Sequence, residues 1–136
     1  MRGAAGAGGG ELTWLEVRDL STGKIVLERV RYCSSFVCRL RGLTFRSRLR
    51  EGEGLLLVGD RQGRAYATIH MMFVFFPIGV VWLDDESRVV DKRLARPFQL
   101  ICAPARPARD ILEGPPELLE RVRTGQQLRL TGDADA

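Results

Sequence analysis

The strongest constraint on the fold of this chain is that its apolar residues occur in short segments separated by turn-forming residues. The run Leu55–Val58 lies between Gly52-Glu53-Gly54 and Gly59–Gly63, and we predict that both flanking stretches are turns. Such a run is typical of a central strand that is buried on both faces. In Arg64–Met71 apolar and polar residues alternate, which predicts a strand with the single histidine, His70, on its more polar face.

Two pairs of segments have the pattern of β-hairpins. Leu12–Asp19 and Lys24–Tyr32 flank a glycine-containing turn, and Ile78–Leu83 and Arg88–Leu94 flank four polar residues that include Asp84 and Asp85. Carboxylates in such a turn favour turn formation and solubility, so we assign no acid–base chemistry to this pair.

The remaining elements are expected to be short. Shorter strands are predicted at Asp110–Glu113 and Gln127–Leu130, and short helices after Ser34 and after Pro115-Pro116. Regular turn signals between period-2 segments favour antiparallel over parallel sheets. The fold class that we predict is mainly β: a compact antiparallel β-sandwich or barrel-like domain with one or two short helices.

A chain of 136 residues has the usual size of one domain. We expect a flexible Gly/Ala-rich tail at 1–10, a single β-rich domain at 11–131 and an acidic tail at 132–136. The longest apolar run, Ile69–Leu83, is interrupted by His70, Pro77 and Gly79, which indicates core rather than a membrane span. The first residues lack the apolar segment of a secretion signal, and three cysteines make a disulfide framework unexpected, so we predict a cytoplasmic protein.

Several segments, in this order, resemble the family known as domain of unknown function 192. They are Arg41–Arg46, Leu49–Leu57, Ile69–Met72, the hairpin from Pro77 to Pro97, and Ile111–Gly114. The resemblance extends roughly over residues 39–130, which makes it a resemblance of the whole domain. It implies a compact, mainly β domain of bacterial or archaeal type and no established activity.

Two positions depart from the family pattern. Gly79 stands where members tend to have an aspartate, and Gly125-Gln126 replaces a late glycine–aspartate pair. Any function that depends on those two carboxylates is not expected in this chain.

Metal binding and hydrolysis find little support in the residue spacing. Cys33, Cys38, Cys102 and His70 are the residue types of a zinc site, but four residues separate the first two cysteines and no second close pair exists. We therefore interpret the cysteines as three reduced, buried residues and predict no metal and no cofactor. For hydrolysis His70 would be the only imidazole base, and no nucleophile motif frames any serine, so no catalytic residue is assigned.

The net charge of +4 comes almost wholly from arginine and is unevenly distributed. The stretch Arg29–Arg64 contains nine arginines and three acidic residues, and within it Arg39–Arg50 interleaves guanidinium groups with apolar residues. Such a block can bind an anion or a nucleic-acid backbone. A structural alternative is that Arg41 and Arg46 pair with a buried carboxylate such as Glu113.

Three hypotheses remain open at this stage. The first is a non-enzymatic binding or accessory module with an unidentified ligand or protein partner. The second is a small enzyme or anion-binding protein that uses a ligand site made of Arg41, Arg46, His70 and Glu113. The third is nucleic-acid binding through Arg39–Arg50, which the scarcity of aromatic residues disfavours.

Overall fold

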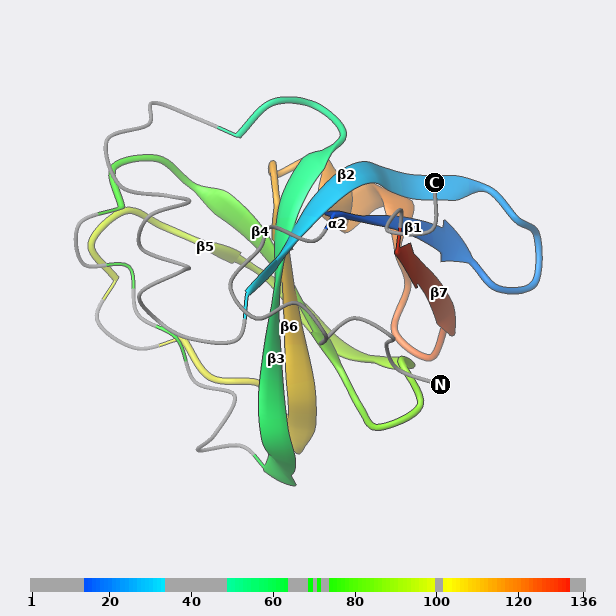
Figure 1. The fold of residues 1–136 in the computed structure, drawn as a ribbon. Coiled ribbons are helices and arrows are strands. Elements are labelled where there is room, and N and C mark those ends of the chain that lie inside the picture. The colour runs from blue at the N-terminus through cyan, green and yellow to red at the C-terminus, as the bar shows by residue number, and fades with distance from the viewer. Residues whose placement is uncertain are drawn as a thin grey trace.

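The computed structural model describes residues 14–33, 49–63, 69, 71, 74–99 and 102–132 of the chain, and the side chains of 60–63 are not described. In these ranges the strands form one seven-stranded sheet in the order β5-β4-β6-β3-β2-β1-β7, accompanied by one short helix (Figure 1). The elements are β1 (Trp14–Asp19), β2 (Ile25–Cys33), β3 (Glu53–Gly63), β4 (Ile78–Leu83), β5 (Val89–Ala95), β6 (Ala108–Gly114), α2 (Leu118–Arg121) and β7 (Leu128–Gly132). The mainly β fold is confirmed.

Most neighbouring strands in the sheet are antiparallel. The hairpins β1–β2 and β4–β5 form where the sequence predicts them, and β6 pairs with both β3 and β4 near the centre of the sheet. The exception is β2, which runs parallel to β3 with Arg29 opposite Glu53 and Cys33 opposite Leu57. Strands β2 and β3 are separated by residues 34–52, long enough for the crossover that a parallel pair requires.

One predicted turn is wrong. Residues 59–63 belong to the end of β3, and Gly63 pairs with Ala108 of β6 after an irregularity in the register that begins at Val58. At this irregularity side chains of β6 satisfy the main chain, because the N–H of Gly59 donates to Asp110 Oδ1 at 3.3 Å and its carbonyl oxygen accepts from Arg109 Nε at 3.0 Å. These contacts and the pairing of Gly63 outweigh the turn propensity of the glycines.

The sheet does not close into a barrel, yet its two edge strands approach each other at one end. An isolated antiparallel bridge joins Arg88, just before β5, to Gln127, just before β7. The main-chain N–H of Val89 donates to the carbonyl of Gln126 at 2.8 Å, and the N–H of Leu128 donates to that of Ser87 at 2.9 Å. Segments from opposite ends of the sheet therefore meet at this rim.

Apolar side chains pack on both faces of the sheet and form two clusters. Cluster 1 contains Leu55, Val80 and Ile111, whereas the next residue in each strand, such as Val81 or Leu112, belongs to cluster 2. This assignment follows from the period-2 geometry of a strand. All six residues of β4 are consequently buried, as expected for a strand that is covered on both sides.

Helix α2 covers part of cluster 2, to which it contributes Leu118, followed by Val122. Its last carbonyls are capped from β5, because Lys92 Nζ donates to the carbonyl oxygens of Leu119 at 2.6 Å and Val122 at 2.8 Å. The helix predicted after the proline pair is thus confirmed, whereas the one predicted after Ser34 lies outside the described residues. None of the helical structure in the described ranges is long and apolar enough to cross a membrane.

Candidate functional site

A buried carboxylate and a partly buried guanidinium lie in one row across the sheet. Arg31 of β2 is opposite Leu55 of β3, Leu55 is opposite Glu113 of β6, and Glu113 is opposite Val80 of β4. Residues that face each other in a ladder project from the same face, which here is the face of cluster 1. Because Arg31 and Glu113 are two strands apart, their backbones are separated by about 10 Å. We call this row the sheet-face site.

Glu113 is the charged residue that is most deeply buried in the described ranges, with 0% of its surface exposed. Its main chain is also tightly enclosed, because a Cβ atom at Gly54 would overlap the Glu113 carbonyl oxygen. Glycine at position 54 therefore allows β3 and β6 to approach closely and fixes the position of Glu113. A carboxylate held in such surroundings requires polar or charged groups around it, since burial of an isolated charge is strongly unfavourable.

Arg31 supplies a donor at the other end of the row. Its Nε atom is buried and has no hydrogen-bond partner among the groups of the described structure. Next to it, the guanidinium of Arg29 stacks over the ring of Trp14 at 4.1 Å from the ring centroid, and Trp14 is opposite Arg31 in the β1–β2 ladder. A buried donor without an acceptor is rare in folded proteins, so the Nε of Arg31 is a candidate position for an acceptor on a ligand.

Arg31 is not among the site residues predicted from the sequence, although a signal for it exists. Val30 and Tyr32 pack on cluster 2, so the alternation of a strand places Arg31 on the opposite, covered face. An arginine at such a position is distinguishable from the solvent-exposed arginines of the same basic stretch only when the neighbouring strands are known.

Of the four predicted ligand-binding residues, the structure describes Glu113 alone. Arg41, Arg46 and His70 lie outside the described residues. The residues that adjoin them in the chain are described and belong to cluster 1: Cys33 and Leu49 on either side of 34–48, and Ile69 and Met71 on either side of His70.

The prediction of three reduced cysteines is wrong for Cys33, which is disulfide-bonded. A sulfur in a disulfide is not a thiolate, so Cys33 cannot serve in the zinc site considered from the sequence. Cys102 is a buried thiol, and Cys38 lies outside the described residues. The odd cysteine count misled the prediction, because an odd number still permits one disulfide.

Comparison with protein-family models identifies the family of this chain. The model of the family DUF192, described as an uncharacterised conserved family, matches residues 18–130. The chain belongs to the DUF192 family. The resemblance proposed from Arg41–Arg46 and the later segments is therefore confirmed, and DUF192 membership indicates no specific function.

Curated relatives of this DUF192 chain carry the name UPF0127 protein and come from Thermococcus and Pyrococcus species. A Thermococcus kodakarensis protein is 36% identical over 100 residues, which is 74% of this chain and 62% of the relative. A Pyrococcus furiosus protein is 31% identical over 112 residues, covering 81% of this chain and 93% of the relative. The chain thus spans less than two thirds of the Thermococcus protein and nearly all of the Pyrococcus protein.

Two crystal structures share the fold. A candidate transcription regulator from Sinorhizobium meliloti superposes with a TM-score of 0.73 at 17% identity, covering 88% of this chain and 94% of that one. A protein of unknown function from Novosphingobium aromaticivorans superposes with a TM-score of 0.68 at 20% identity, covering 87% and 84%. At these identities the similarity establishes the fold alone.

Proposed function

We propose that this protein is a non-enzymatic binding module that holds a small anionic ligand at the sheet-face site. Arg31 would donate to the ligand, and Arg41 and Arg46 would complete a ring of guanidinium groups around it. Glu113 would orient these cations from the floor of the site. The observation that carries the proposal is the buried Nε atom of Arg31, which lacks an acceptor in the described structure.

The contribution of Arg41 and Arg46 is supported by the chain on either side of them. Cys33 and Leu49, which precede and follow residues 34–48 in the chain, both pack in cluster 1, on the face of Arg31 and Glu113. His70 is part of the proposal because Ile69 and Met71, its neighbours in the chain, are both buried in cluster 1.

The energetics favour an anion as the missing acceptor. A buried donor without a partner destabilises a protein by about 1–3 kcal/mol, and more when the group is charged. A carboxylate or phosphate oxygen that accepts from Nε recovers this loss and adds a charge-assisted hydrogen bond. Arg31 would therefore bind an anion more tightly than a single guanidinium on the protein surface does.

A direct test is to follow the Nε–Hε resonance of Arg31 by NMR while acetate or inorganic phosphate is added. We expect a saturable shift of this resonance, and we expect Arg31→Lys to weaken binding about tenfold because lysine lacks Nε and the planar fork. Arg129→Lys is the matched control, since Arg129 is exposed on β7. If neither anion shifts Arg31 Nε–Hε in the wild-type protein, the proposal fails without reliance on any variant.

The non-enzymatic part of the proposal has its own test. The purified protein should not turn over representative esters, phosphates or glycosides. Turnover that is lost in His70→Ala would instead establish the enzyme hypothesis.

Nucleic-acid binding is the second candidate, favoured by the Arg29–Trp14 stack beside Arg31 and by the description of the Sinorhizobium neighbour as a candidate transcription regulator. It predicts affinity for DNA or RNA that falls steeply with rising salt. If the protein shows no salt-dependent binding of DNA or RNA near physiological ionic strength, this candidate function is excluded.

We also propose a cytoplasmic location. The disulfide at Cys33 does not exclude this location, because the intracellular proteins of some organisms contain disulfides. Fractionation of the native host would test it, and recovery of the protein outside the cytoplasm would contradict it.

A further inference from the structure

A second candidate site lies at the rim where the two edges of the sheet meet. Three loops line a cleft of about 350 Å³: the β1–β2 turn, the β4–β5 turn and the loop between α2 and β7. The polar residues that line it are Asp19, Ser21, Arg88, Arg123, Gln126 and Gln127. The volume is at the lower end of the range for sites that bind small molecules. We call it the rim cleft.

Two guanidinium groups dominate the charge of the rim cleft. Arg88 donates from Nη1 to the carbonyl oxygen of Gly125 at 3.2 Å and from Nη2 to Oε1 of Gln127 at 3.3 Å. These long contacts are to neutral oxygens, and Arg88 makes no ion pair with the residues that the structure describes. The side chain of Arg123 has neither an ion pair nor a hydrogen bond within the described structure.

The one carboxylate of the cleft is already used by the chain itself. Asp19 Oδ2 accepts from Thr22 Oγ1 at 2.6 Å and from Ser21 Oγ at 3.2 Å, which ties the carboxylate to its own turn. The hydrogen bond from Thr22, with smaller contributions from Gln126 and Ser21, lowers the pKa of Asp19 to about 2. Asp19 is therefore part of the wall of the cleft, and the two arginines remain for a ligand.

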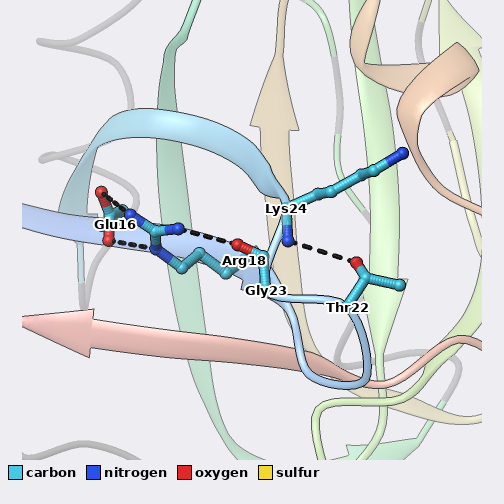
Figure 2. Close-up of polar contacts among 5 residues, drawn as sticks. All are labelled: Glu16, Arg18, Thr22, Gly23 and Lys24. Carbon is cyan, nitrogen blue, oxygen red and sulfur yellow. Dashed lines mark hydrogen bonds and ion pairs between the residues drawn. The ribbon is translucent and has the colours of Figure 1, made fainter.

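The β1–β2 turn that forms this wall is also braced on its other side. Figure 2 shows Arg18 donating from Nη1 to the Gly23 carbonyl oxygen at 2.7 Å, while its Nε donates to Glu16 at 2.7 Å. In the same view the main-chain N–H of Lys24 donates to Thr22 Oγ1 at 3.2 Å. A turn held in this way loses little conformational freedom when a ligand binds.

We propose that the rim cleft binds a small hydrophilic anion that carries a carboxylate or phosphate group, at a site separate from the sheet-face site. Arg88 and Arg123 hold the anionic group. The amides of Gln126 and Gln127 already bond to the chain, since Gln126 Oε1 accepts from the N–H of Arg123 and Gln127 Nε2 donates to the carbonyl oxygen of Glu86, both at 2.8 Å. The second N–H of each amide and the hydroxyl oxygen of Ser21 are left for the remaining polar groups of the ligand. Because segments from both ends of the sheet contribute to the cleft, a bound anion also links β5 to β7.

The test uses inorganic phosphate and citrate as separate probes, measured by calorimetry and by the Nε–Hε resonances of Arg88 and Arg123. Saturable binding with a dissociation constant below about 10 mM is expected for one or both probes. Preference for phosphate would identify a phosphoryl ligand, and preference for citrate a carboxylate ligand. If neither probe saturates in this range, the proposal is overturned.

Substitutions show at which site the anion binds. Arg123→Gln should weaken it about tenfold, as the loss of one charge-assisted contact predicts, whereas exposed Arg129→Gln should leave it unchanged. Arg31→Lys, which weakens binding at the sheet-face site, should not alter the response of the Arg88 and Arg123 Nε–Hε resonances. If Arg31→Lys abolishes it and Arg123→Gln does not, the anion binds at the sheet-face site and the rim cleft is not a site.

Discussion

The sheet-face site and the rim cleft both contain arginine, but their surroundings differ in a way that changes what each can do. Arg31 is partly buried above an apolar cluster, and its Nε is shielded from solvent. Arg88 and Arg123 are exposed, and turn residues surround them. A donor in the low-dielectric interior interacts strongly with one acceptor, whereas exposed guanidinium groups attract anions more weakly and over a longer range.

The two regions also differ in how the fold holds them. The sheet-face site depends on the register of four central strands and on the close approach of β3 to β6. The rim cleft depends on three turns and on the bridge between Arg88 and Gln127. A change in the sheet interior should therefore affect the first region and leave the second intact.

The largest expected effect comes from Gly54→Ala. Its Cβ would overlap the main-chain carbonyl of Glu113 and come within 2.9 Å of Leu27 Cδ1, so β3 and β6 must separate. We expect a loss of about 1–3 kcal/mol in the free energy of unfolding, measured by denaturant titration, together with a shift of the Arg31 Nε–Hε resonance. The Arg123 resonance should not move.

Gly114→Ala is the matched control for this substitution. Its Cβ would meet Leu118 Cδ2 at 3.1 Å, which is the end of a flexible side chain. Gly114→Ala should therefore lower the free energy of unfolding less than Gly54→Ala does. Equal stability of Gly54→Ala and the wild-type protein would mean that β3 and β6 do not fix Glu113 as described.

The dependence of binding on salt should separate the two sites. Raising NaCl from about 0.05 M to about 0.5 M shortens the Debye length from about 14 Å to about 4 Å, which screens exposed charges far more than buried ones. We expect phosphate affinity at the rim cleft to fall several-fold, and affinity reported by Arg31 to change by less than about twofold. Equal salt dependence at both sites would remove the distinction between them.

The local elements could be predicted from the sequence because their signals are local. The β1–β2 and β4–β5 hairpins follow from period-2 segments around turn residues, and Asp84 confirms its turn role by accepting from the N–H groups of Glu86 and Arg88. The parallel pairing of β2 with β3 could not be predicted, because it depends on how residues 34–52 cross over. For the same reason the sequence did not show that the sheet ends meet at the rim.

The candidate sites were predictable to the same limited extent. Glu113 could be selected because it is a carboxylate within an apolar strand, and the structure places it fully inside. Arg31 required knowledge of the neighbouring strands, since many arginines surround it in the sequence. The rim cleft combines residues from positions 19 to 127, a proximity that no local pattern contains.

The smallest expected effect concerns the wall of the rim cleft. Thr22→Val removes the strongest hydrogen bond to Asp19, so the pKa of this carboxyl should rise from about 2 toward its ordinary value of 3.8. Because the pKa of Asp19 is lower in the folded than in the unfolded protein, its contribution to stability is present above about pH 4 and is lost as the pH falls toward 2. In Thr22→Val this acid-dependent contribution should shrink, as a carboxyl NMR titration and acid unfolding can measure.

Ser21→Ala serves as the comparison for Thr22→Val, since the hydrogen bonds from Ser21 lower the pKa of Asp19 less than the hydrogen bond from Thr22 does. In Thr22→Val Asp19 remains ionised at pH 7, so the affinity of the rim cleft for phosphate should stay close to that of the wild-type protein. An unchanged pKa of Asp19 in Thr22→Val would show that the turn does not hold the carboxylate. A marked change in phosphate affinity at pH 7 would show that Asp19 acts on the ligand directly, which would make the rim cleft a site of mixed charge and remove its contrast with the sheet-face site.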